Sequence, residues 1–158
     1  MKIIAIGGVP GTGKSTLMKQ FMEQYGGRDW QFKTDTKLVP YYNITRTYVL
    51  GSYPEGEVFG GTDKMSMAVQ PEAIKFLASL PNDSIVIFEG DRLFNSSFLS
   101  HCFDKYDLRI IVLEANEDER NRRYQERGSN QDQTWLEGRI SKVKNIQGNL
   151  EFFGCRET

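Results

Sequence analysis

Residues 2–16 read Lys2-Ile3-Ile4-Ala5-Ile6-Gly7-Gly8-Val9-Pro10-Gly11-Thr12-Gly13-Lys14-Ser15-Thr16. The part up to Gly8 is a short apolar run that ends in glycines, which is typical of a buried β-strand. From Thr16 to Tyr25, apolar side chains recur at helical spacing, at Leu17, Phe21, Met22 and Tyr25. The segment therefore predicts a strand, a glycine-rich loop and a helix in direct succession.

The loop between this strand and this helix matches the phosphate-binding pattern G-x-x-x-x-G-K-[ST], and the strand and helix are the context that the pattern requires. Glycines let the backbone curl so that successive N–H groups face a phosphate, and the positive end of the helix dipole adds to the attraction. We expect Lys14 to reach the β- and γ-phosphates and Ser15 to place its hydroxyl on Mg²⁺. The candidate nucleotide-binding residues are Gly11, Thr12, Gly13, Lys14, Ser15 and Thr16. The alternative is a glycine-rich turn that only joins a strand to a helix.

The rest of the chain alternates between strand and helix patterns. Ser84–Glu89 and Leu108–Leu113 are continuous apolar runs of the kind that a parallel sheet covered on both faces requires. Helical patterns stand between and after them, at Pro71–Leu80, Glu117–Arg127 and Thr134–Gln147. This order predicts an α/β fold, a parallel β-sheet sandwiched by helices, as one domain over residues 1–158. The segment Trp30–Phe59 is expected to form short strands or a hairpin.

Composition excludes several classes of protein. The chain has 158 residues, 39% of them hydrophobic, and a formal net charge of -1, so no global field draws it to nucleic acid or to an anionic membrane. Its first apolar run is too short for a membrane span or a signal peptide, and we expect a cytoplasmic protein without a membrane partner. The single histidine and the two distant cysteines, Cys102 and Cys155, exclude a histidine-based triad and a structural zinc site.

The motif and its surroundings resemble the P-loop kinases of the nucleoside, nucleotide and polynucleotide kinase group. The opening Lys2–Thr16 is similar to the start of phage polynucleotide kinase, and a strand, a carboxylate and an arginine-rich helix follow in the kinase order. The resemblance implies phosphoryl transfer from ATP with Mg²⁺. Glu89 and Asp91 follow an apolar strand at the edge where ligands bind in open α/β sheets, so they are the candidate metal carboxylates. The alternative for them is a local ion pair with Arg92.

Two further roles rest on the same resemblance. Kinases similar to polynucleotide kinase place the carboxylate that accepts the acceptor's proton about where Asp35 stands, although an Asp among Thr residues is also a common turn former. The segment near 116–133 resembles the lid of small P-loop kinases, which implies that Arg123 and Arg127 close over the triphosphate. A solvated amphipathic helix is the alternative for this segment. On the next helical segment, Arg139, Lys142 and Lys144 are expected behind the lid, in reach of phosphates.

The acceptor is expected to bind the middle of the chain. Gly61–Pro71, together with Glu89–Leu93, resembles the phage kinases that phosphorylate 5-hydroxymethyluracil within DNA, an early step in thymidine hypermodification. The resemblance implies substrate binding by Asp63, Lys64 and Arg92, and it implies the host cytoplasm if a phage encodes the protein. Gly60-Gly61 would let the backbone approach a ligand closely. The alternative for Thr62-Asp63 is a cap at the start of a helix over Met65–Leu80.

Other acceptors and a non-catalytic role stay open at this point. A deoxynucleoside monophosphate kinase, a polynucleotide 5′-hydroxyl kinase and an ATP-binding module without turnover all fit the motif. The net acidity argues against duplex DNA, because affinity for DNA comes from neutralising phosphates. A local groove could be lined by Lys33, Lys37, Arg46, Lys64 and Arg92. Four tyrosines could stack on an extruded base or simply line a sheet edge: Tyr41, Tyr42, Tyr48 and Tyr53.

Overall fold

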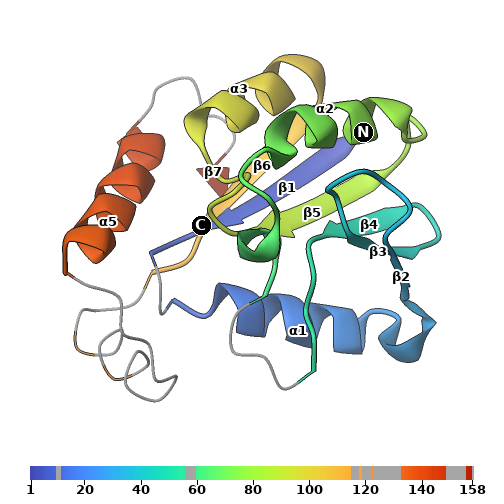
Figure 1. Cartoon of the computed structure of the whole chain (residues 1–158), viewed down its shortest axis with the longest axis horizontal. Coiled ribbons are helices and arrows are strands. Elements are labelled where there is room, and N and C mark those ends of the chain that lie inside the picture. Colours follow the sequence, from blue (N-terminus) through green and yellow to red (C-terminus); the bar gives the residue numbers. More distant parts are fainter. Residues whose placement is uncertain are drawn as a thin grey trace.

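The computed structural model describes residues 1–9, 12–55, 60–114, 118, 122, 133–148 and 156–157 (Figure 1). The strands are β1 (Lys2–Gly7), β2 (Gln31–Lys33), β3 (Tyr41–Ile44), β4 (Thr47–Leu50), β5 (Ile85–Glu89), β6 (Asp107–Val112) and β7 (Arg156–Glu157). The helices are α1 (Lys14–Gln24), α2 (Val69–Ser79), α3 (Ser96–Lys105) and α5 (Gln133–Gly148), with short 3-10 turns η1 (Gly27–Asp29) and η2 (Thr62–Lys64). Within these ranges, no helix combines the length and the apolar character needed to cross a bilayer.

The strands form one sheet in the order β2-β3-β4-β5-β1-β6-β7. Pairing is parallel from β4 through β7, whereas β2 and β3 add to the β4 edge in antiparallel fashion. The hairpin of β3 and β4, with β2 beside it, is the structure expected for the segment after Trp30. The mostly parallel sheet confirms the predicted α/β class.

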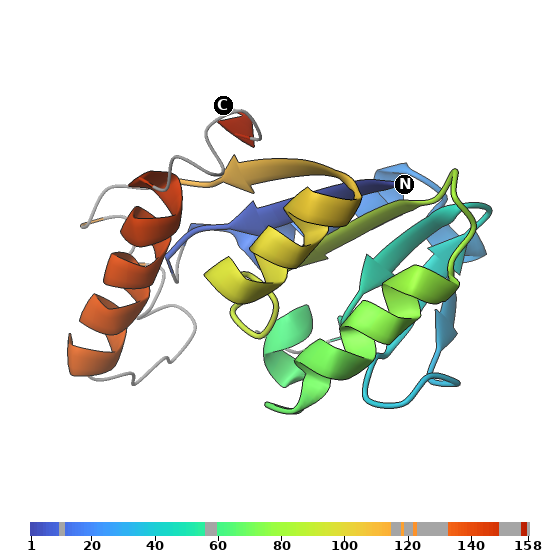
Figure 2. The same ribbon diagram turned by 90° about the horizontal axis from the view of Figure 1, so that it is seen from above.

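Helices cover both faces of this sheet. In Figure 1, α1 lies on one face, and α2 and α3 lie on the other. Side chains of β1 point alternately to the two faces of the sheet. Ile3 belongs to the buried cluster that includes residues of α2 and α3, whereas Ile6 belongs to the cluster with Met18 and Met22 of α1. Helix α5 lies beyond the carboxyl ends of β1, β5 and β6 (Figure 2). The carboxyl edge of the parallel strands therefore lies between α1 and α5.

Helix α1 buries Met22 of the expected apolar residues and, beside it, Met18. Met18 and Met22 are buried, whereas Leu17 and Tyr25 are 37% and 51% exposed. Tyr25 follows the last helical residue and stacks on Phe21, with ring centroids 5.5 Å apart. Two neighbouring stripes of apolar residues run along this helix at a spacing of four, and only its docking on the sheet selects the methionine stripe.

Two elements were not expected from the sequence. Helix α3 begins after Asn95, whose side chain accepts a hydrogen bond from the Phe98 N–H at 2.9 Å, and it buries Phe98, Leu99 and Cys102. Strand β7 is only two residues long, too short for any periodic pattern. The expected helix Glu117–Arg127 lies outside the described residues apart from the isolated positions Asp118 and Arg122.

Candidate active site at the carboxyl edge of the sheet

The glycine-rich loop connects the end of β1 to the start of α1. Its described part turns at Gly13, which has a left-handed backbone (φ 91) and directly precedes the first helical residue, Lys14. The Lys14 Nζ donates to the carbonyl oxygens of Gly8 at 2.8 Å and Val9 at 3.3 Å, and the Thr12 hydroxyl donates to the Val9 carbonyl at 2.8 Å. These bonds hold a positive charge over the loop. Gly11 lies outside the described residues.

Glu89 is the last residue of β5 and is 1% exposed. It follows Ile87 on the α1 side of the sheet, so its carboxylate meets the start of α1. Its Oε1 accepts hydrogen bonds from the Ser15 hydroxyl at 3.1 Å and from the Tyr53 hydroxyl at 2.9 Å. Burial raises the pKa of Glu89 to about 7, and the nearby positive charge of Lys14 opposes that rise. A bound cation would therefore stabilise the ionised form of this buried carboxylate.

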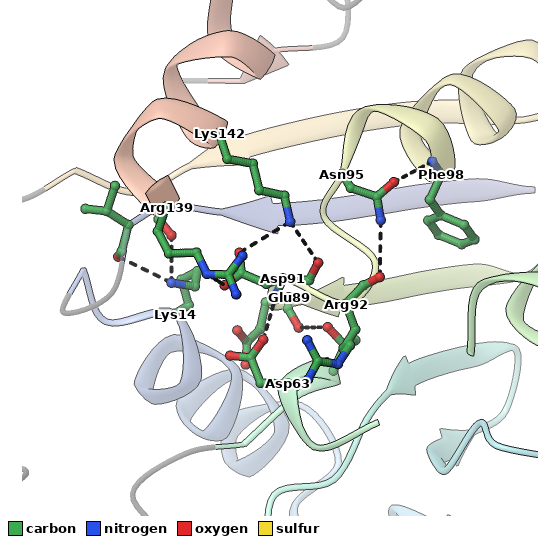
Figure 3. Close-up of polar contacts among 12 residues, drawn as sticks. Lys14, Asp63, Glu89, Asp91, Arg92, Asn95, Phe98, Arg139 and Lys142 are labelled. Atoms are coloured by element: carbon green, nitrogen blue, oxygen red, sulfur yellow. Dashed lines mark hydrogen bonds and ion pairs between the residues drawn. The ribbon is translucent and has the colours of Figure 1, made fainter. Parts of the chain in front are cut away.

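Asp91 lies two residues further on and joins the site to α5. Its carboxylate pairs with Arg139 at 3.0 Å (Oδ2 to Nε) and with Lys142 at 3.7 Å (Oδ1 to Nζ), and its carbonyl accepts from Lys142 at 3.0 Å. Figure 3 shows both basic side chains reaching from α5 toward Asp91, with Lys14 and Asp63 beside it. Burial lowers the pKa of Lys142, and the Asp91 carboxylate counteracts this effect. The described ion-pair partners of Asp91 are thus on α5, and the alternative of a local ion pair with Arg92 is not found among the described contacts.

The segment around η2 is attached to the same loop. The Thr62 hydroxyl donates to the Glu89 carbonyl at 2.9 Å, and the Asp91 N–H donates to Asp63 Oδ1 at 2.7 Å. Arg92 continues this contact by donating from Nε to the Met65 carbonyl at 3.1 Å. Desolvation and, secondly, the Asp91 carboxylate raise the pKa of Asp63. The three predicted acceptor residues, Asp63, Lys64 and Arg92, therefore lie on the two segments that meet at the carboxyl edge.

Two expectations about this segment are corrected. Asp63 does not cap a helix that starts at Met65, because α2 starts at Val69 after Ala68 without a side-chain cap, and Asp63 binds the Asp91 N–H instead. The close approach at Gly61 is to protein and not to a ligand. A Cβ there would lie 2.1 Å from Glu89 Oε1, and the φ of +77 is one that L side chains rarely adopt.

Asp35 is not brought together with these residues. It follows β2, which is four strands away from β1 and hence about 19 Å from it at the usual strand spacing. Its Oδ1 accepts from the Tyr41 hydroxyl at 3.0 Å, and it lines a separate cavity of about 380 Å³ beside α2. Asp35 is far from β1 because strands β3 and β2 extend the sheet beyond β4.

Three members of the proposed basic groove and tyrosine platform do not fit those roles. Arg46 pairs with Asp83 at the opposite edge of the sheet, where β5 begins. Tyr41 and Tyr53 are 7% and 8% exposed, so neither ring face is open to a base. Arg123 and Arg127, the expected lid arginines, lie outside the described residues.

Tyr53 is the site residue whose role sequence reasoning missed. It stands 36 positions before Glu89, in no motif, and among several tyrosines. No local pattern distinguishes a tyrosine that binds a buried carboxylate from one that packs on a sheet. Burial raises the pKa of Tyr53 well above its ordinary value.

The donors at this edge fit Mg²⁺ bound with a nucleotide. Ser15 Oγ and Glu89 Oε1 lie 3.1 Å apart, and both are oxygen atoms of the kind that Mg²⁺ prefers as ligands. Among the described residues, no group of three or more His, Cys, Asp or Glu could hold a metal by itself. Mg²⁺ commonly uses one or two protein ligands and completes its octahedron with phosphate oxygens and water.

A parallel sheet with a phosphate-binding loop between β1 and α1, and with a buried carboxylate on the neighbouring strand facing that loop, defines a P-loop nucleotide-binding protein. The comparison with family models is more specific. The model described as P-loop Nucleotide Kinase3 matches residues 1–156, and the chain belongs to that family. It is therefore a kinase, and the family implies phosphoryl transfer from ATP. No curated protein matches the sequence.

Proposed function

We propose that this kinase transfers the γ-phosphoryl group of ATP to the hydroxymethyl group of 5-hydroxymethyluracil in DNA. One observation carries the proposal: the two segments that resemble such kinases, although 27 to 28 positions apart, are hydrogen-bonded to each other beside Lys14. Thr62 binds the carbonyl of Glu89, and Asp63 binds the N–H of Asp91. The acceptor segment is thus part of the same edge as the phosphate-binding loop.

The residues of this edge divide the tasks of phosphoryl transfer. Lys14 leaves the loop carbonyls to contact the β- and γ-phosphates, where its charge stabilises the transition state. Ser15 and Glu89 would hold Mg²⁺, which when bound withdraws charge from the phosphate oxygens. Arg139 and Lys142 exchange their contact with Asp91 for contact with the triphosphate, because both are cations that reach the same edge.

Asp63 is the proposed base for the acceptor hydroxyl, in preference to Asp35. The acceptor oxygen forms a bond to Pγ, the bond from Pγ to the bridging oxygen of ADP breaks, and the hydroxyl proton moves to the Asp63 carboxylate. A raised pKa improves a carboxylate as a proton acceptor near neutral pH. Asp35 is the less favoured candidate, because the strand before it lies four strands from β1, about 19 Å at the usual strand spacing.

An acceptor carried by a polymer fits the accessibility of this segment. Lys64, Ser66 and Met67 are exposed, and Met67 is 85% exposed, although the backbone of this segment is hydrogen-bonded to the loop after β5. An exposed and firmly held segment can meet a base that is presented from a large molecule. Lys64 adds a positive charge there, which favours a phosphate backbone.

The experiment supplies purified protein, Mg²⁺ and γ-labelled ATP to four acceptors in parallel. These are a duplex containing 5-hydroxymethyluracil, the same duplex with thymine, a 5′-hydroxyl oligonucleotide, and the set of deoxynucleoside monophosphates. Both duplexes carry 5′-phosphates, so that end-labelling cannot imitate labelling of the base. Lys14→Ala protein serves as the control for contaminating kinases.

We expect label on the 5-hydroxymethyluracil duplex and none on the thymine duplex. Label on the monophosphates or on the 5′-hydroxyl end alone would refute the proposed acceptor and leave the kinase assignment intact. With the favoured acceptor, Asp63→Asn should lower transfer by about 10² to 10⁴-fold, whereas Asp35→Asn should stay near wild type. The reverse order of these two variants would return the base to Asp35.

A further inference from the structure

The side chain of Tyr53 is buried, and the residue is 8% exposed. It belongs to the buried cluster that also contains Ile6, Met18, Val49 and Ile87. Gly60 lies close to its ring, because a Cβ there would lie 2.6 Å from the Tyr53 ring. A buried tyrosine hydroxyl needs a hydrogen-bond partner, and here that partner is the Glu89 Oε1, at 2.9 Å.

The backbone of Tyr53 is fixed as well. Its N–H donates to the Tyr42 hydroxyl at 3.0 Å, and the two rings lie 6.2 Å apart. Just before it, Ser52 forms an isolated bridge with Gly61, with bonds of 2.9 and 3.3 Å. Contacts with Tyr42 of β3 and with Gly61 of the acceptor segment therefore fix the backbone of Tyr53, whose hydroxyl donates to Glu89.

Tyr53 and Ser15 donate to the same oxygen of Glu89. The two donors differ in their other task. The Ser15 hydroxyl would ligate the cation with a lone pair while its O–H still donates to the carboxylate, so its position depends on the cation, whereas Tyr53 is held by protein contacts alone. Tyr53 is then the donor that fixes the carboxylate of Glu89 independently of the cation.

We infer that Tyr53 is a positioning residue for the metal carboxylate, which holds Glu89 in the orientation that binds the cation of the metal–ATP complex. The inference rests on the metal role proposed for Glu89 and Ser15. Partners that orient metal ligands in this way are commonly worth 10 to 100-fold in metal affinity or activity. Tyr53 touches neither the nucleotide nor the acceptor in this scheme.

The test measures ATP binding by calorimetry, without any acceptor, once with excess Mg²⁺ and once with EDTA. Tyr53→Phe removes only the hydroxyl, and we expect about 10-fold weaker binding with Mg²⁺ and less than about 2-fold change with EDTA. In the transfer assay, the same variant should need more Mg²⁺ for half-maximal rate and regain most of its rate at saturating Mg²⁺. Tyr106→Phe, at the start of β6 on the opposite edge, is the matched control and should bind like wild type.

Tyr42→Phe gives a second, milder perturbation, in case the buried Tyr53→Phe variant does not fold. It removes the acceptor for the Tyr53 N–H, so a smaller loss restricted to the Mg²⁺ condition is expected. Equal weakening with Mg²⁺ and with EDTA would identify a purely structural tyrosine and overturn the inference, as would wild-type binding in both. Glu89→Gln tests the metal role separately from the role of Tyr53. If its affinity for ATP is weakened to the same extent with Mg²⁺ and with EDTA, or is unchanged in both, the metal role of Glu89 is itself wrong.

Discussion

Replacing Glu89 with glutamine should change how the stability of the protein depends on pH, because burial raises the pKa of this carboxyl group. Below pH 4.5 the group is protonated in both the folded and the unfolded chain. Between pH 4.5 and about 7 the unfolded chain releases its proton first, because the pKa in the folded protein is about 7. Folding stability is therefore lost as the pH rises through this window, and the full loss is present above pH 7.

The size of the effect follows from the same two pKa values. The difference between 4.5 and about 7 corresponds to about 3 kcal/mol, at about 1.4 kcal/mol per pH unit. Glu89→Gln cannot ionise, so its free energy of unfolding relative to wild type should rise by about 3 kcal/mol between pH 4.5 and pH 8. For a chain of this length that is a relative rise in Tm of roughly 6 to 12 °C.

The assay is urea unfolding of both proteins at pH 4.5, 5.5, 6.5, 7.5 and 8.0, without nucleotide or divalent cation. Cations are left out because they favour the ionised carboxylate and mask the effect. Any difference in shape or hydrogen bonding between Gln and Glu is independent of pH and cancels from the slope. A difference between the two proteins that stays constant across this range would refute the reasoning, since Glu89 would then have an ordinary pKa.

Three further substitutions test other parts of the site. Lys14→Ala should lower transfer at least 10²-fold while the protein still folds, because the lysine acts mainly on phosphate charge; an active variant in the labelled-ATP assay would contradict this. Arg139→Ala should weaken ATP binding about 10-fold in calorimetry, while Lys105→Ala, an exposed lysine at the end of α3, should not; equal effects would exclude a specific phosphate contact. Gly61→Ala should destabilise the fold by about 1 to 3 kcal/mol in urea, because its Cβ would meet the Glu89 carboxylate at a left-handed backbone position, and full stability would show that the loop adapts.

Much of the fold was readable from short-range patterns. The apolar run of β1, the glycine loop and the helical start at Lys14 lie within fifteen residues, so their chemistry is local and the motif defines it. The buried strands β5 and β6 are continuous apolar runs, which also depend only on neighbouring residues. Helix α3 was not predicted, because it has only 10 residues and its start is marked by one capping residue, Asn95.

The residues of the candidate site likewise fall into two groups, those that local sequence patterns predict and those that only the packing of the chain brings together. By itself, the sequence predicted the phosphate-binding loop and the carboxylates Glu89 and Asp91 at the end of β5 from residues close together in the chain, and its resemblance to P-loop kinases indicated the class. Only the tertiary structure decided that Asp63 binds the Asp91 N–H while Asp35 follows a strand four positions from β1, that α5 brings Arg139 and Lys142 onto Asp91, and that Tyr53 binds Glu89. The physical reason is that strand order and helix docking set these contacts. Both are properties of the whole packed sheet, in which residues tens of positions apart meet at one edge.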